Sequence, residues 1–302
     1  MSRITVITLN WNGNEVLRDM INSLAPQLIE LEARLIVLDN CSTDGSDRAA
    51  FDEFGGEPWF SLIRAERNLG FAAGANLVIN NSDDEILVLA NNDTVFAPGS
   101  LKLLVDALER HPEAGMAGPR LLWPDGSLQP SMRDFPFPGK LIREHLPFIR
   151  KKTAIHSLHL KEQKVDWLVG AVMAFRRKAL FDAGLFDEDY FFYHEETDLQ
   201  YRFYRSGWEV WFVPAASVIH LEGVSARQMF GQETWLRYIP GKIRFLRKHG
   251  KYGTVTGFRL FMTLLHSCRL LAGMVKPGKR KHDIRYTISY CRKAIRLTWK
   301  NN

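Results

Sequence analysis

Four short segments that favour β-strands, each followed by Asn or Asp, constrain most strongly what this chain can fold into. In the clearest of them, residues 86–90 form an unbroken apolar run that leads directly into Asn91-Asn92-Asp93. Such a run, bounded by polar residues, is typical of a strand buried on both faces of a parallel sheet. The other three segments follow the same plan: residues 4–9 precede Asn10, residues 35–38 precede Asp39, and residues 61–64 lie shortly before Asn68.

Helical patterns fill the intervals between these strands. Apolar residues recur at helical spacing at Leu17, Met20, Ile21 and Leu24, and again at Leu101, Leu104, Val105 and Leu108. The alternation predicts an α/β fold with a mostly parallel central sheet flanked by helices. Because such sheets bind ligands beyond the carboxyl ends of their strands, we expect one ligand cleft lined by Asn10, Asp39, Asn68 and Asp93.

The glycines near this cleft exclude two common nucleotide sites. Gly70 and Gly74 do not match the G-x-G-x-x-G spacing of dinucleotide-binding folds. The chain also lacks the G-x-x-x-x-G-K-[ST] phosphate loop. The sequence therefore predicts a nucleotide-like cleft that is neither a simple NAD site nor a simple ATP site.

Asp93 is a candidate ligand of a divalent cation. A hard cation usually takes one or two protein carboxylates and completes its coordination shell with phosphate oxygens and water. In the alternative interpretation, Asp93 caps a turn before the helix that begins at Pro98-Gly99-Ser100.

Three carboxylates stand close together at Glu195, Glu196 and Asp198. Mutual repulsion can raise the pKa of one of them, and a raised pKa suits a general base that takes a proton from a hydroxyl group. The alternative is an acidic first helical turn, which the helix dipole favours. Before this cluster, we expect one strand over residues 165–175 and an irregular excursion over residues 127–164.

Charge is distributed unevenly along the 302 residues. Residues 235–302 hold 17 Lys and Arg but one Asp, whereas residues 1–234 hold 23 basic and 33 acidic residues. We therefore expect a domain over 1–230 and a basic helical extension over 231–302 that meets a polyanionic surface. The three cysteines are far apart and form no Cys-x-x-Cys pair. A disulfide framework is therefore not expected, and a reducing, cytoplasmic compartment fits.

The extension contains an amphipathic segment over residues 255–275. Its polar members Arg259, His266 and Arg269 argue against a simple transmembrane span. At about 100° per residue these three lie within about 80° of one another. The pattern predicts a helix in the interface of an anionic membrane, with basic flanks attracted to the lipid. The alternative is a helix packed on the larger domain with a solvated basic face.

Several motifs follow one another in a fixed order over residues 3–225. They are Asn10-Trp11-Asn12, Val37-Leu38-Asp39-Asn40-Cys41-Ser42-Thr43-Asp44-Gly45-Ser46, Asn68-Leu69-Gly70-Phe71-Ala72-Ala73-Gly74-Ala75-Asn76, Asn91-Asn92-Asp93-Thr94, Gly118-Pro119, Asp125-Gly126, Gly184-Leu185-Phe186-Asp187, His194-Glu195-Glu196-Thr197-Asp198-Leu199, Gly207-Trp208 and His220-x-x-Gly-x-Ser225. Each motif is weak by itself. Together they resemble the family 2 glycosyltransferases of the GT-A fold, and within them a bacterial rhamnosyltransferase-like branch.

The resemblance implies roles for individual residues. It places the metal, Mg²⁺ or Mn²⁺, at Asp93 and His220, and the catalytic base at Glu196, with Glu195 and Asp198 as alternatives. It assigns nucleotide-sugar binding to Asn10, Asn12, Asp39, Asn68, Gly70, Gly74, Asn76, Asn92 and Asp93. Two positions depart from the family pattern, because Asn91 replaces the first Asp of the metal motif and Glu196 replaces the usual Asp base.

The function implied is transfer of a sugar, with inversion, from a dTDP- or UDP-linked donor to a saccharide or polyprenyl-linked acceptor. The resemblance favours rhamnose, with galactofuranose, glucose and N-acetylglucosamine as alternatives. It also implies a role in bacterial surface-polysaccharide synthesis, at the inner face of the cytoplasmic membrane. A catalytically silent, membrane-bound nucleotide-sugar scaffold is the competing hypothesis. A nucleic-acid partner is not expected, because the domain body is acidic and has no recognition motif.

Overall fold

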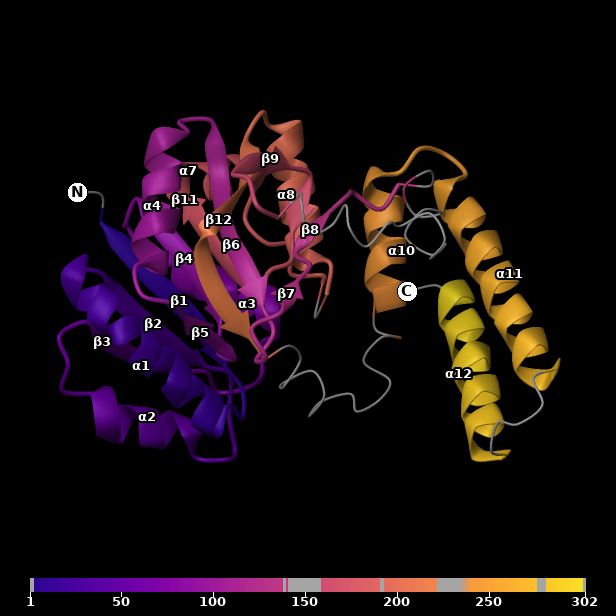
Figure 1. Cartoon of the computed structure of the whole chain (residues 1–302), viewed down its shortest axis with the longest axis horizontal. Coiled ribbons are helices and arrows are strands. Elements are labelled where there is room, and N and C mark those ends of the chain that lie inside the picture. The colour runs from indigo at the N-terminus through magenta and orange to yellow at the C-terminus, as the bar shows by residue number, and fades with distance from the viewer. Residues whose placement is uncertain are drawn as a thin grey trace. The chain divides into compact units, whose positions relative to one another are not determined.

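The computed structural model describes residues 3–137, 140, 159–190, 193–221, 236, 238–275 and 281–300. The chain forms two compact units, residues 1–135 with 150–225, and residues 136–149 with 226–302. Figure 1 shows an α/β unit and a helical unit. The expected boundary after residue 230 lies outside the described residues.

The α/β unit is built on one large mixed sheet with strand order β3-β2-β1-β4-β11-β6-β12-β5. Its first half is parallel, as the sequence predicts. These strands are β1 (Ile4–Asn10), β2 (Arg34–Asp39), β3 (Phe60–Arg64) and β4 (Ile86–Asn91). The apolar runs fill the buried positions of β1 and β4, so their polar ends emerge together at one edge of the sheet.

The second half of the sheet reverses direction. Strand β11 runs antiparallel to both β4 and β6, whereas β12 is parallel to β6 and antiparallel to β5. The strands concerned are β5 (Thr94–Phe96), β6 (Ala114–Leu122), β11 (Val172–Arg176) and β12 (Glu209–His220). Short strands β7 (Leu128–Gln129) and β9 (Gln163–Val165) pair with β6 and β12.

Helices cover both faces of this sheet (Figure 1). On one face lie α1 (Asn14–Glu30), α2 (Ser46–Phe54) and α4 (Ser100–Arg110). On the other lie α3 (Phe71–Asn80), α7 (Arg177–Ala183) and α8 (Glu195–Arg205). The predicted apolar stripe of α1 is buried, because burying apolar area is the main driving force for packing a helix on a sheet.

The single strand expected over residues 165–175 is wrong in detail. The segment divides into the end of β9, β10 (Trp167–Leu168) and β11. Strand β10 leaves the main sheet and pairs with β8 (Met132–Arg133). A Cβ on Gly170 would lie 3.2 Å from the Cβ and Cγ atoms of Glu196, so this break lets the backbone pass close to helix α8.

The second unit contains three helices that pack against one another: α10 (Tyr238–His249), α11 (Thr254–Val275) and α12 (Lys281–Trp299). Apolar side chains such as Ile243 and Phe245 of α10, Met262 of α11 and Ala294 of α12 are buried. Among the described residues, no helix is both long enough and apolar enough to cross a membrane.

Candidate active site

The carboxyl ends of β1, β2 and β4 bring the predicted polar residues together. Asn10 is in register with Asp39, and Leu9 is in register with Asn91. Asn10, Asp39, Asn92 and Asp93 are all buried. A buried polar group needs hydrogen-bond partners, and at this edge of the sheet the polar side chains form hydrogen bonds with one another.

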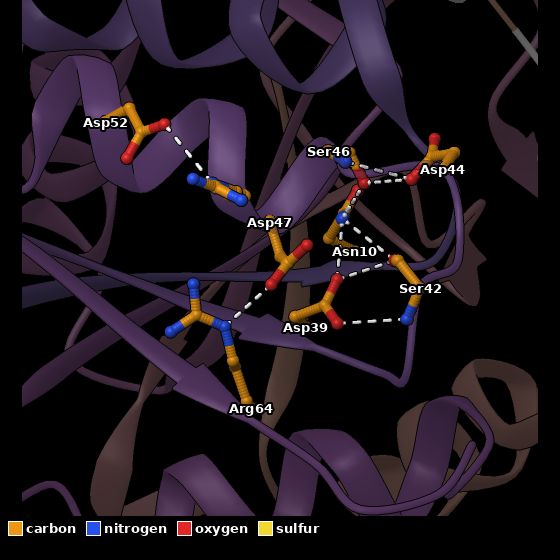
Figure 2. Close-up of polar contacts among 9 residues, drawn as sticks. Asn10, Asp39, Ser42, Asp44, Ser46, Asp47, Asp52 and Arg64 are labelled. Carbon is orange, nitrogen blue, oxygen red and sulfur yellow. Dashed lines mark hydrogen bonds and ion pairs between the residues drawn. The ribbon is translucent and has the colours of Figure 1, made fainter.

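Asn10 is the centre of this network. Its Nδ2 atom lies 2.9 Å from Asp39 Oδ1, 3.2 Å from Ser42 Oγ and 2.8 Å from Ser46 Oγ. Figure 2 shows Asn10 between these three side chains. On its other side, Asn10 Oδ1 accepts a hydrogen bond of 3.0 Å from Asn92 Nδ2. Asn10 therefore links the loop after β2 to the loop after β4.

The loop after β2 is folded around the Asp39 carboxylate. Oδ2 accepts from the backbone N–H of Ser42 at 2.9 Å, and Oδ1 accepts from Ser42 Oγ at 2.6 Å, so one side chain holds the residue three positions further along the chain. Asn12 braces the loop, because its backbone N–H donates to Ser42 Oγ and its Oδ1 accepts from the backbone N–H of Thr43. Asn12 and Cys41 have φ values of 52° and 66°.

A second loop, before α3, contains Asn68 and Gly70. Asn68 Oδ1 accepts from Gly70 N at 2.8 Å, and the Asn40 side chain holds the backbone of Leu69 and Gly70. Gly70 has φ 79° and ψ −179°, a conformation that is open almost only to glycine. A Cβ on Gly74 would lie 3.2 Å from the side chains of Leu9 and Leu38, so Gly74 lets α3 pack closely on the sheet.

The structure places Asn76 away from the strand ends. Its Nδ2 donates to the backbone carbonyl of Phe186 and to Glu188 Oε1, both at 2.9 Å, and its Oδ1 accepts from Phe186 N at 3.0 Å. These contacts join α3 to the segment that follows α7. The implied nucleotide-binding role of Asn76 stays a prediction, and the side chain as placed braces the fold.

Asp93 and His220 meet although they are far apart in the sequence. Strand β12 pairs with β5 so that His220 is opposite Thr94, and His220 Nε2 lies 3.4 Å from Asp93 Oδ1. His220 Nδ1 lies 3.0 Å from Gln129 Oε1, so Nδ1 donates there and Nε2 faces the carboxylate. Both acid and imidazole are about 6% exposed at the side chain.

This pair fits the donor set of a divalent cation. An imidazole nitrogen and a carboxylate oxygen are both ligands that divalent first-row metals accept, and here Nε2 and Oδ1 face each other at 3.4 Å. A hydrogen bond from the second ring nitrogen to an oxygen acceptor is the usual support of a metal-binding histidine. No group of three or more His, Cys, Asp or Glu side chains placed to hold a metal occurs among the described residues, so the protein would supply few ligands.

The acidic turn of α8 separates into two environments. Burial raises the pKa of Glu196 to about 7, and burial together with the nearby Glu196 raises the pKa of Glu195 well above its usual range. Neither Glu195 Oε2 nor Glu196 Oε2 has a hydrogen-bond partner within the part of the chain that the structure describes. Tyr193 and His194, directly before them, have φ values of 69° and 74°, the kind of backbone strain that clusters at active sites.

Asp198 lies in a different environment. Its fully buried carboxylate accepts from Arg202 Nε at 2.7 Å. Arg202 also donates to the backbone carbonyls of Ala183 and Leu185. This arginine therefore ties α8 to α7, and Asp198 is its counter-ion.

The sequence motifs assigned no role to four residues that hold the site in place. Ser46 and Gln129 contact Asn10 and His220 as described. Gln200 Oε1 accepts from Leu168 N at 2.7 Å and its Nε2 donates to Leu168 O at 2.9 Å, which fixes α8 to β10. Glu188 holds Asn76. Of these, Ser46 had a sequence signal, because it is the last residue of the motif over residues 37–46.

Comparison with known proteins identifies the family. The model of glycosyl transferase family 2 matches residues 5–181. An N-acetylglucosaminyl-diphospho-decaprenol L-rhamnosyltransferase of Mycobacterium tuberculosis is 33% identical over 238 residues, which cover 72% of this chain and 75% of that protein. The O-antigen biosynthesis protein RfbC of Myxococcus xanthus is 26% identical over 78% of this chain but 19% of its own length.

Solved structures support the fold. The mannosyltransferase PcManGT of Pyrobaculum calidifontis, in complex with GDP-Man and Mn²⁺, superposes with a TM-score of 0.66 at 15% identity and covers 100% of this chain and 88% of that one. GalNAc-T7 with UDP, GalNAc and Mn²⁺ gives a TM-score of 0.63 at 14% identity over 99% of this chain and 56% of that one. The predicted family and GT-A fold are confirmed: the chain belongs to glycosyl transferase family 2 and is a glycosyltransferase.

Proposed function

We propose that this glycosyltransferase transfers L-rhamnose, with inversion, from dTDP-rhamnose to a lipid-linked N-acetylglucosaminyl diphosphate during synthesis of a bacterial cell-surface polysaccharide. The observation that carries the proposal is the 33% identity to the mycobacterial L-rhamnosyltransferase, which extends over 75% of that protein. The lipid-linked acceptor in that relative's name also supports work at the inner face of the cytoplasmic membrane.

In this proposal Glu196 is the general base. Its carboxylate takes the proton of the acceptor hydroxyl while the hydroxyl oxygen forms a bond to the anomeric carbon of the sugar. The bond between that carbon and the diphosphate breaks, and dTDP leaves with the electron pair. A pKa of about 7 supports this role, because a base works best when its pKa lies near the working pH. Asp198 is a poor candidate, because its carboxylate is paired with Arg202.

We assign the nucleotide to the edge formed by the loops after β1, β2 and β4, where Asn10 joins the loops of Asp39 and Asp93. Asp93 and His220 would hold a divalent cation, Mn²⁺ or Mg²⁺. When bound, such an ion stabilises the charge that grows on the leaving diphosphate. The support comes from the position of His220 Nε2 facing Asp93 and from the Gln129 contact at Nδ1.

The test is nucleotide release from dTDP-rhamnose, UDP-glucose, UDP-N-acetylglucosamine and UDP-galactofuranose. The acceptor is N-acetylglucosaminyl diphosphate on a short alkyl chain, which keeps it soluble. We expect release of dTDP that depends on the acceptor. Release of UDP from one UDP-sugar alone would overturn the rhamnose assignment and retain the enzyme, and release from none would overturn both.

Metal dependence is tested separately. We expect EDTA to abolish turnover and Mn²⁺ or Mg²⁺ to restore it. Gln129→Ala should raise the Mn²⁺ concentration for half-maximal turnover about 10–100-fold, the usual cost of removing a residue that orients a ligand. Gln163→Ala is the matched control, and direct Mn²⁺ binding by calorimetry gives a readout besides activity. Turnover that persists in EDTA would contradict the Asp93–His220 site.

A further inference from the structure

Helix α11 is amphipathic, as its sequence predicts. Its polar side is turned into the helical unit, whereas a helix with a solvated basic face would turn that side towards water. His266, in the middle of its polar side, is 3% exposed and lies near the ring of Tyr290 of α12. Arg259 stacks over Trp299 of α12 at 5.4 Å. The polar side of α11 is therefore turned towards α12, within the helical unit.

Leucines occupy the outward face of α11. Leu260, Leu264 and Leu271 are 58%, 65% and 64% exposed. At about 100° per residue they lie within about 40° of one another, opposite the buried Phe258 and Met262. The other exposed members of this face are Thr256, Gly257 and Cys268. The face carries no charge within the described part of α11, since Arg269 lies about 160° away from its centre.

Helix α12 supplies the charge that the leucine face of α11 lacks. Its outward residues include Arg292, Lys293 and Arg296, which with Ile288 and Ser289 line a surface cavity of about 380 Å³. Figure 1 shows α11 and α12 side by side, running in opposite directions, and the two helices are in contact. A leucine face and a basic face thus belong to neighbouring helices.

Trp299 marks the seam between the two helices. It is 46% exposed and its indole N–H donates to Thr263 Oγ1 of α11 at 2.9 Å. A half-exposed tryptophan with a satisfied N–H suits the boundary between lipid and water, where such side chains are enriched.

We infer that the outward faces of α11 and α12 form a docking surface for an anionic phospholipid membrane, in which Leu260, Leu264 and Leu271 enter the lipid and Arg292, Lys293 and Arg296 contact lipid phosphates. A row of exposed leucines of this kind marks an interaction site rather than ordinary surface. Helices with an apolar face lie in the membrane interface, and basic residues bind anionic lipid headgroups there.

Charge decides between a membrane and a second copy of the chain. Residues 235–302 contain 17 basic residues and one acidic residue, so two copies that met through this surface would bring two strongly positive units together. Such repulsion opposes self-association, whereas an anionic bilayer is complementary in both charge and polarity. The inference deepens the proposed function, because a lipid-linked acceptor resides in a membrane, but its test does not depend on turnover.

The test is cosedimentation of the full-length protein with vesicles of phosphatidylethanolamine and phosphatidylglycerol, compared with vesicles of phosphatidylcholine. We expect binding to the anionic vesicles that weakens with added salt. Replacing Leu260, Leu264 and Leu271 together by Ser should lower the partition coefficient about tenfold or more. The matched control replaces Ile29 and Leu160, two other exposed apolar residues, by Ser and should bind like the wild type.

A charge variant separates the two faces. Replacing Arg292, Lys293 and Arg296 by Gln should weaken binding to anionic vesicles and reduce its salt dependence. Replacing three exposed cations of the other unit, Arg48, Lys161 and Arg205, by Gln is the control of equal charge. Unchanged binding of the leucine variant would overturn the inference, as would a wild-type dimer that dissociates in that variant and binds no vesicles.

Turnover is measured with the soluble acceptor, so the test of the proposed function does not depend on membrane binding. Both α11 and α12 variants should release dTDP at the wild-type rate. Vesicle binding without turnover of any donor would overturn the proposed function alone, and turnover without vesicle binding would overturn the docking surface alone.

Discussion

Glu196 combines a buried carboxyl group, a pKa near neutrality and an oxygen without a partner among the described residues. We therefore expect Glu196→Gln to lower kcat about 10²–10⁴-fold and to leave the dissociation constant of dTDP unchanged, measured by calorimetry. Glu195→Gln is the matched control, and its kcat should fall much less. The reverse order of losses would assign the base to Glu195.

The same residue should set the pH dependence. The base must be ionised to act, and burial raises the pKa of Glu196 to about 7. Consequently kcat/KM should rise about tenfold per pH unit below pH 7 and level off above it. The measurement is a pH–rate profile from pH 5 to 9. A pH–rate profile in which kcat/KM does not change slope near pH 7 would contradict the assignment of Glu196 as the general base.

Asp198 should show the opposite pattern to Glu196. Replacing it by Ala leaves the mostly buried Arg202, 17% exposed at the side chain, without its counter-ion, which should lower the free energy of unfolding by up to about 3–5 kcal/mol. Urea denaturation measures this loss. A large loss of kcat at unchanged stability would instead return Asp198 to the list of candidate bases. The i, i+4 pairing with Arg202 was visible in the sequence, but its burial was not.

At the scale of elements, the loops after β1 and β4 meet where only glycine fits. A Cβ on Gly13 would lie 2.3 Å from Asn10 Oδ1 and 2.3 Å from Asn92 Nδ2. Gly13→Ala should therefore break the Asn92–Asn10 hydrogen bond and weaken dTDP binding about tenfold, because the bond is worth roughly 0.5–1.5 kcal/mol and the loops must also shift. Gly56→Ala, where a Cβ meets nothing within 4 Å, is the control. Equal dTDP affinity in the two variants would contradict this role for Gly13.

The sequence predicted the elements where local patterns determine them. The apolar runs before Asn10, Asp39 and Asp93 became the parallel strands β1, β2 and β4, because their burial needs no information from elsewhere. Pairing between distant segments was not predictable in this way. The antiparallel position of β11 and the contact of Gln129 with His220 depend on residues far apart in the chain. Periodicity also identified α11 as amphipathic without indicating which face is turned inward.

At the scale of the whole molecule, the raised pKa of Glu196 carries a cost in stability. In the unfolded chain the Glu196 carboxyl group ionises near its usual pKa of 4.5, and in the folded protein near 7. The contribution of this group to the free energy of unfolding is therefore fully present below pH 4.5 and is lost as the pH rises through 7. Glu196→Gln should therefore be more stable than the wild type at pH 8, by up to about 3 kcal/mol, and similar at pH 4.5. Acids with a lowered pKa, such as Asp47 beside Arg64, are present in both proteins, so their contributions to the free energy of unfolding cancel when Glu196→Gln is compared with the wild type. Equal stability at pH 8 would contradict it.

Strand β12 joins the sheet last in chain order and brings His220 to the loop of Asn91 and Asp93, although His220 follows Asn91 by 129 positions in the sequence. Long-range pairing of this kind forms late, because the intervening chain must first be closed into a loop. During translation the parallel strands β1, β2 and β4 leave the ribosome well before β12. A nascent chain would thus complete the loops that we propose to bind the nucleotide before it presents His220. The proposed Asp93–His220 metal site can therefore form only when nearly three quarters of the chain has been made.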